Sequence, residues 1–187
     1  MQRLTGAEQA LRGTLEDRRP ELYWLAFLLT GHRERSVDAV TEALDFADGA
    51  NPFFRNWMLA WARRLVIAKA LFAIRGELAA SVRRPDWLTE AYALPPRNWS
   101  LAANTTRLRL EDALLAIDVF PRCALLLMVF ERVSLEDAAT LLNSDPDLVR
   151  KAKATGLRAL THNLARKQGW TSAGANLNML TGKMQHA

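Results

Sequence analysis

Three features of the sequence predict an all-α protein made of two small helical domains joined by a linker. Apolar residues recur at helical spacing in one run after another, and the period-two alternation of β-strands is almost absent. Two of these runs meet across the tight polar turn 143–146, which outlines a helix-turn-helix. Between 81 and 104 prolines interrupt the helical pattern, so a linker is expected there. The predicted domains are therefore 1–80 and 105–170, and the tail 171–187, which has no clear period, is expected to be flexible.

The first domain should contain three helices. An apolar run at 22–30, too short to cross a membrane, ends at Gly31, a typical residue after a helix C-terminus. The next helix, 33–47, carries on one face the apolar residues Val37, Val40 and Leu44. A longer helix over 53–78 carries an apolar stripe that we expect to form a core, comprising Trp57, Trp61, Leu65, Ala68 and Phe72.

The linker contains three large aromatic residues, Trp87, Tyr92 and Trp99. Solvated coil rarely carries several side chains of this size, because each exposes a large apolar area to water. Part of the segment is therefore expected to dock on a domain or on a partner.

The second domain is predicted to begin with helices over 106–118 and 121–131, the latter opened by Pro121. Ser134 can cap the first helix of the helix-turn-helix, with Asp137 in the place of the usual capping-box acid. The buried stripe of that helix is expected to comprise Leu135, Ala138, Ala139 and Leu142.

The second helix of the motif should begin at Pro146, because proline suits the first helical position, and should run through Leu160 to Lys167. In such motifs the N-terminal part of this helix faces the major groove of DNA.

The positive charge of the chain is concentrated on this second helix. The whole chain has 25 Lys and Arg against 20 Asp and Glu, a net charge of +5. The segment 147–167 has one acid and an equal excess of bases, which are Arg150, Lys151, Lys153, Arg158, Arg166 and Lys167. Bases near a helix C-terminus are also common on a solvated face. With the turn and the preceding helix in place, we favour a surface for nucleic acid.

The remaining residues predict neither an enzyme nor a cofactor or metal site. Cys123 lies in the apolar run CALLLMVF and is expected in a core, and the three histidines are far apart in sequence. No glycine-rich phosphate loop is present. No apolar run is long enough to span a bilayer and the N-terminus lacks the apolar core of a signal peptide, so a cytoplasmic protein is expected.

Two blocks of the chain, 20–78 and 106–166, resemble in order regions 2 and 4 of the extracytoplasmic-function (ECF) sigma factors of bacterial RNA polymerase. LYWLAFLLTGHRERSVDAVTEALDFA has the apolar helix, glycine turn and acidic helix of region 2, with matches at Gly31, Asp38, Val40 and Glu42. FFRNWMLAWARRLVIAKAL resembles the helix that reads the −10 promoter element, with matches at Phe54, Trp57, Ala62 and Arg63. The region 4 resemblance, a helix-turn-helix that reads the −35 element, rests on Pro121-Arg122 and LEDAATLL.

The resemblance implies a transcription factor that binds core RNA polymerase and promoter DNA. The residues implied for polymerase are Asp38, Thr41, Glu42 and Asp45, whose acids would otherwise be assigned to a solvated helix face. The residues implied for promoter DNA are Arg63, Arg64 and Lys69 in the first domain and Arg150, Lys151, Lys153 and Arg158 in the second. An anti-sigma factor is a further partner of the kind that this family has.

Several residues depart from the family pattern. Arg64 and Ala68 replace the usual Asn and Asp of the −10-reading helix, and Thr155-Gly156 replaces Arg-Ala in the recognition helix. Gly156 costs about 1 kcal/mol relative to Ala inside a helix unless a close helix contact requires it. The resemblance is therefore to a divergent member. Two alternatives stay open, a regulator or protein-interaction module that keeps the fold without initiating transcription, and a plain helix-turn-helix repressor.

Overall fold

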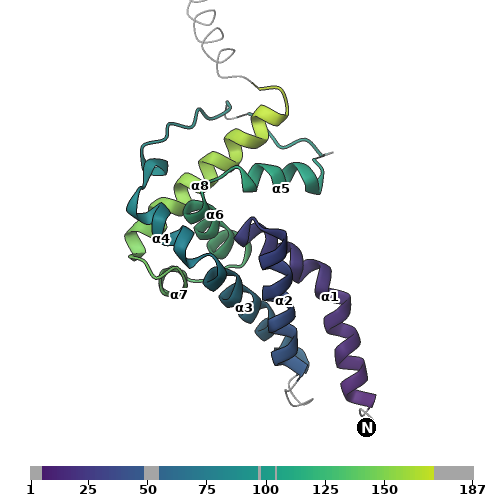
Figure 1. Ribbon diagram of the computed structural model, residues 1–187. Helices are drawn as coiled ribbons and strands as arrows, with labels where there is room; N and C mark the ends of the chain where they lie inside the picture. The colour runs from purple at the N-terminus through teal and green to yellow at the C-terminus, as the bar shows by residue number, and fades with distance from the viewer. Residues whose placement is uncertain (1–5, 49–54, 97, 104, 171–187) are drawn as a thin grey trace, which may run out of the picture. The chain divides into compact units, whose positions relative to one another are not determined.

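The computed structural model describes residues 6–48, 55–96, 98–103 and 105–170, and every regular element in these ranges is a helix (Figure 1). The chain divides into two compact units, Met1–Ala79 and Ala80–Ala187. The predicted all-α class of small helical domains is therefore confirmed. The predicted flexible tail, 171–187, lies outside the described residues.

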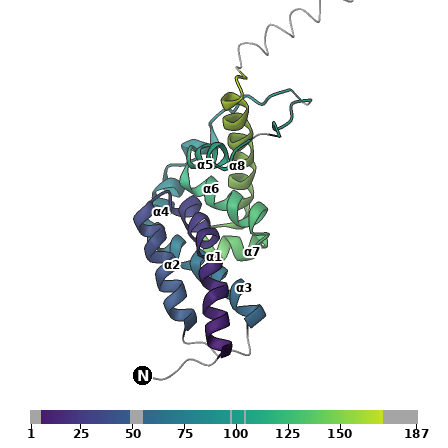
Figure 2. The ribbon, with the colours of Figure 1, turned by 90° about the vertical axis from the view of Figure 1, so that its right-hand side faces the viewer.

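The first unit is built on three helices, α1 (Gly6–Thr30), α2 (Arg33–Asp48) and α3 (Arg55–Ala73), each of which packs against the other two (Figures 1 and 2). The apolar run predicted at 22–30 is the end of the much longer α1. Gly31 terminates this helix with a φ of 74°, where a side chain would be strained, and its N–H donates to the Phe27 carbonyl at 2.8 Å.

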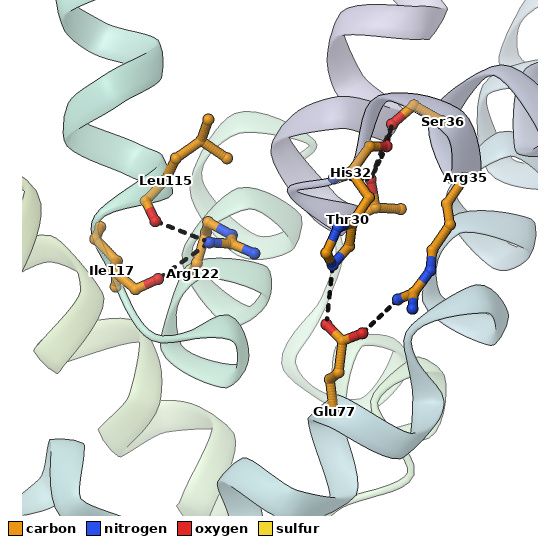
Figure 3. Close-up of polar contacts among 8 residues, drawn as sticks. All are labelled: Thr30, His32, Arg35, Ser36, Glu77, Leu115, Ile117 and Arg122. Atoms are coloured by element: carbon orange, nitrogen blue, oxygen red, sulfur yellow. Dashed lines mark hydrogen bonds and ion pairs between the residues drawn. The ribbon is translucent and has the colours of Figure 1, made fainter.

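Polar side chains fix the turn between α1 and α2 (Figure 3). The buried hydroxyls of Thr30 and Ser36 share a hydrogen bond of 2.8 Å. Glu77, from the following helix α4 (Arg75–Arg83), lies 3.6 Å from Nε2 of His32 and forms an ion pair with Arg35. These contacts hold the start of α4 against the α1–α2 turn.

The prediction of which residues of α2 and α3 form the core is wrong in part. Phe72 is 64 % exposed and Trp61 37 % exposed, Ala68 is also exposed, and the side chain of Trp57 lies outside the described part. The buried face of α3 consists instead of smaller residues, Ala62, Val66, Ile67, Ala70 and Leu71. Because α3 is apolar around most of its circumference, small residues that allow close helix packing, rather than the largest rings, occupy the core. Likewise, α2 buries Ser36, Ala39, Val40 and Ala43 and leaves Val37 exposed.

The long helix predicted over 53–78 is divided in two. It ends at Ala73, and α4 begins at Arg75 after a tighter turn in which the Ile74 N–H donates to the Leu71 carbonyl at 3.3 Å. Gly76 lies in the first turn of α4, with open space around it.

The second unit contains a 3₁₀ turn (Asp86–Leu88), α5 (Arg107–Leu115), α6 (Val119–Leu125) with a following π-helical turn (Leu126–Phe130), α7 (Leu135–Leu141) and α8 (Pro146–Lys167). The central helix α6 is almost completely buried and packs against α8 (Figure 2). Cys123 is fully buried there, as predicted.

Much of the segment expected to be a linker is packed on this second unit. Trp87 is only 2 % exposed, stacks on Phe120 with ring centroids 5.7 Å apart, and donates its indole N–H to the Ser81 carbonyl at 3.2 Å. Ser81 also forms a hydrogen bond with Asp118, the cap of α6. The expectation that part of this segment docks on a domain is confirmed at Trp87.

A buried guanidinium holds the turn between α5 and α6. Arg122 is 7 % exposed, and its Nη1 donates to the carbonyls of Leu115 at 3.2 Å and Ile117 at 3.1 Å (Figure 3). These carbonyls belong to the end of α5 and the turn after it, where a helix leaves acceptors without internal partners. Arg122 therefore acts as a C-terminal cap for α5.

Candidate nucleic-acid interface

Helices α7 and α8 lie where the sequence predicts a helix-turn-helix, and local hydrogen bonds define the turn between them. The Ser134 hydroxyl accepts the Asp137 N–H at 3.1 Å, as the capping pattern predicted. After α7, Asn143 adopts a left-handed conformation with φ of 47°, and the Ser144 N–H donates to the Ala139 carbonyl at 2.9 Å.

The start of α8 is fixed more strongly than the sequence indicated. Pro146 occupies the first helical turn, as predicted, and Asp145 precedes it as the cap. One carboxylate oxygen of Asp145 accepts the N–H groups of Asp147 at 2.8 Å and Leu148 at 3.2 Å. The helix ends at Lys167, again as predicted.

Gly156 sets which face of α8 is buried. A Cβ atom at this position would lie 2.5 Å from the Pro121 carbonyl oxygen and 3.1 Å from Cβ of Leu125, so α8 approaches the backbone of α6 closely here. The close contact explains the glycine inside a helix. Along the same face α8 buries Val149, Ala152, Ala159 and Leu160.

The opposite face of α8 is open and positively charged, and we call it the recognition face. Its exposed residues recur at helical spacing and are Arg150, Lys151, Ala154, Leu157 and Arg158. Arg150 forms an ion pair with Asp147 one turn before it, and both side chains are well exposed. Exposed pairs of this kind contribute little to stability, so the guanidinium can exchange Asp147 for a phosphate at small cost.

The other bases of the predicted interface lie differently. Lys153 is half-buried at the side of the helix, toward its packed face. At the C-terminal end, Lys167 forms a 2.7 Å ion pair with Asp112 of α5. Of the four bases predicted for DNA on α8, the structure thus brings Arg150, Lys151 and Arg158 onto one open face.

A short stretch of the preceding segment lies on the C-terminal half of the recognition face. We call residues 92–96 with 98–99 the strap. Leu94, Pro95, Pro96 and Trp99 of the strap enclose, with Leu157, Arg158 and Thr161 of α8, a hollow of about 270 Å³. The Trp99 N–H donates to the Pro96 carbonyl at 2.8 Å, which turns the strap back at its end.

Aromatic rings hold the strap to α8. His162 lies between Tyr92 and Trp170, with ring centroids 5.8 and 5.9 Å away, and its Nδ1 donates to the Ala93 carbonyl at 2.8 Å. Burial, together with a hydrogen bond to Glu90, raises the pKa of Tyr92 above its ordinary value. The phenol therefore stays protonated at neutral pH and continues to donate to Glu90. The sequence predicted that aromatic residues of this segment dock, but it did not predict that they contact His162. The only sign of this contact in the sequence is the presence of Tyr92 and Trp170 in neighbouring segments.

The bases predicted on α3 do not share a face. Arg64 is exposed, whereas Lys69, five residues later, points toward α2 and forms a 2.7 Å ion pair with Glu42. Arg63 is half-buried and lines a hollow against α1 with Arg18 and Glu21. The structure therefore joins one residue predicted for DNA, Lys69, to one predicted for polymerase, Glu42.

The four residues predicted for polymerase do share one face of α2. Asp38, Glu42 and Asp45 are exposed at successive helical turns, and Thr41 is half-buried beside them. Thr41 lines a shallow apolar hollow of about 340 Å³ between α1 and α2, with Tyr23, Val37 and Val40. An acidic row thus borders an apolar depression.

The described residues contain no group of His, Cys, Asp and Glu side chains suited to a metal ion. None of the described helices combines the length and the apolar character that crossing a membrane requires.

Comparison with models of protein families, with curated proteins and with solved structures found no match for this chain.

Proposed function

We propose that this protein is a sigma-like transcription factor that binds core RNA polymerase and promoter DNA in the cytoplasm and works by binding rather than by catalysis. The observation that carries the proposal is the recognition face of α8. It follows a tight turn after α7, is fixed at its start by the Asp145 cap, and presents Arg150, Lys151 and Arg158 together.

Charge and position both support contact with duplex DNA. The N-terminal turns of the second helix are the part that enters the major groove in this class of motif. Lys151 and Arg158 have no acidic partner among the described residues, and Arg150 has only an exposed one. Each cation that neutralises a phosphate releases condensed counterions, which makes such binding favourable and strongly dependent on salt.

The acidic row of α2 supports a separate surface for polymerase. The carboxylates of Asp38 and Asp45 are exposed and can meet a basic patch on a partner, whereas that of Glu42 is already paired with Lys69. Complementary charges of this kind increase the rate of encounter and fix the register of the complex. The apolar hollow beside Thr41 provides a surface that a partner side chain can bury.

The decisive experiment is transcription in vitro with core polymerase from the same cell, on DNA from upstream of the gene for this chain. Wild type should direct initiation, and the double substitution Asp38→Lys and Asp45→Lys should abolish association with core. These two acids are chosen because Glu42 is already paired with Lys69. Surface changes of this kind alter stability by no more than about 0.5 kcal/mol, so the fold should be unaffected.

The matched control makes the same charge change elsewhere, with Asp17→Lys and Glu136→Lys at exposed positions of α1 and α7. These substitutions should leave core binding intact. A wild-type chain that binds duplex DNA but not core polymerase contradicts the sigma-like proposal and favours a plain repressor. A chain that binds neither favours a regulator that has kept only the fold.

A further inference from the structure

The strap occupies a continuation of the face that we propose for DNA. Leu157, Arg158 and Thr161, which line the hollow beside the strap, follow Arg150 and Ala154 at helical spacing on α8. In Figure 1 this stretch is part of the teal segment that passes α8 before α5 begins. Because the strap and α8 belong to the same compact unit, their contact is internal to that unit.

The position of the strap along α8 conflicts with bound DNA. With a rise of about 1.5 Å per residue, Arg158 lies about 12 Å along the helix from Arg150. The major groove is about 12 Å wide. A helix whose first turns enter the groove therefore brings its fourth turn to the phosphate strand at the edge. The strap lies beside Leu157 and Arg158 of that fourth turn, where this strand would pass.

Few contacts hold the strap in place. Among the described residues one hydrogen bond, from His162 to the Ala93 carbonyl, joins it to α8. The remaining contacts are the ring pair of Tyr92 with His162 and the walls of the hollow. Leu94 and Leu157 stay exposed although they line this hollow, so the strap covers α8 loosely. The strap can therefore detach from α8 without unfolding this helix.

We propose that the strap is a detachable cover of the recognition face, and that duplex DNA and the strap compete for Arg158 and its neighbours. This inference rests on the proposed function of α8. A binding-competent state that is populated for only a fraction of the time lowers the apparent affinity by that fraction. The strap therefore reduces DNA binding until it is displaced.

The test uses the full chain and a mixed-sequence DNA duplex at low salt. Tyr92→Ala removes the ring that contacts His162 but changes no residue of α8. If the strap is closed for about nine-tenths of the time, this variant should bind DNA about tenfold more tightly than wild type. A second variant, Pro95→Gly with Pro96→Gly, loosens the strap by another route and should act in the same direction. The control is Leu101→Ala, an exposed apolar residue just beyond the strap, which should have no effect.

A second measurement reports on the strap itself. Adding DNA to wild-type protein should accelerate chymotrypsin cleavage after Tyr92 and Trp99, because the displaced strap is more accessible. If both variants bind DNA with the affinity of wild type, the strap is not a cover of the recognition face, and the proposed function of α8 is unaffected. Weaker binding, together with protection from cleavage by DNA, also overturns it and makes the strap part of the DNA interface. No DNA binding by any version removes the proposed function of α8 and the cover together.

Discussion

Helices α3 and α8 are of similar length, 19 and 22 residues, and each carries bases predicted to bind DNA, yet they present these bases in opposite ways. On α8, Arg150, Lys151 and Arg158 are exposed on one face of the helix. On α3, Lys69 is paired with Glu42 of α2 and Arg63 lies against α1. Charge content alone therefore does not identify a binding surface. The packed face of the helix decides whether its bases are gathered or divided.

The two helices differ because their packed faces are set by different constraints. A close approach at Gly156 sets how α8 packs against α6, and the N-terminal half of the opposite face stays exposed. In contrast, α3 packs against both α1 and α2 and is apolar on most sides, so its bases fill the gaps between contacts. The exposed row of α3 comprises Trp61, Arg64, Ala68 and Phe72.

The largest expected effect concerns DNA binding and compares the two helices directly. Arg150→Glu with Lys151→Glu should flatten the dependence of log affinity on log salt by roughly two units, one for each phosphate that the variant no longer neutralises. At a salt concentration of about 0.1 M this corresponds to roughly sixtyfold weaker binding. The measurement is a salt titration of duplex binding by fluorescence anisotropy.

The matched variant on α3, Arg63→Glu with Arg64→Glu, has the same change of charge. Because only Arg64 is well exposed there, its slope should fall by at most about one unit in the same titration. Equal reductions from the two helices would contradict the comparison, and an unchanged slope in the α8 variant would remove the assignment of the recognition face.

The second prediction tests the close approach that orients α8. Gly156→Ala should destabilise the protein by about 1–3 kcal/mol, because the added methyl group meets the backbone of α6 and overpacks the contact. Without that contact the same change would stabilise a helix by up to about 1 kcal/mol. Gly76→Ala in α4 supplies this control, since nothing lies within 4 Å of its Cβ position. Urea denaturation of both variants should give changes of opposite sign.

The same comparison explains how much of this structure could be predicted from sequence. The boundaries of α8 were predicted because Pro146 and the polar turn mark its start, and local backbone chemistry needs no knowledge of neighbouring helices. The buried face of α3 was not predicted correctly, because alanine, valine and tryptophan all fit an apolar pattern. Which of these residues become buried depends on how α3 packs against α1 and α2. The position of the strap on α8 could not be predicted for a similar reason, because the contact of Tyr92 with His162 joins residues 70 positions apart in the chain.

The third prediction concerns the start of α8. Asp145→Ala removes an acceptor shared by two backbone N–H groups and should reduce the free energy of unfolding by about 1 kcal/mol. Asp145→Asn keeps a side-chain oxygen at the cap and should recover most of the loss. Thermal unfolding followed by circular dichroism measures both. A loss that Asn does not recover would show that the charge of Asp145, rather than its hydrogen bonds, stabilises this end of the helix.

The smallest expected effect is at Phe72, a ring of α3 that lies mostly in water. Phe72→Ala should cost no more than about 1 kcal/mol, because the main contact of the ring is the Arg75 guanidinium, 4.4 Å from the ring centre. The matched substitution Ile67→Ala removes a smaller side chain that is buried against the neighbouring helices, and it should cost about 2–5 kcal/mol. Urea denaturation of the two variants therefore ranks the faces of α3. If Phe72→Ala proved the more damaging of the two, the exposed row would have to pack against something in solution, and the division between the open face of α8 and the occupied faces of α3 would no longer hold.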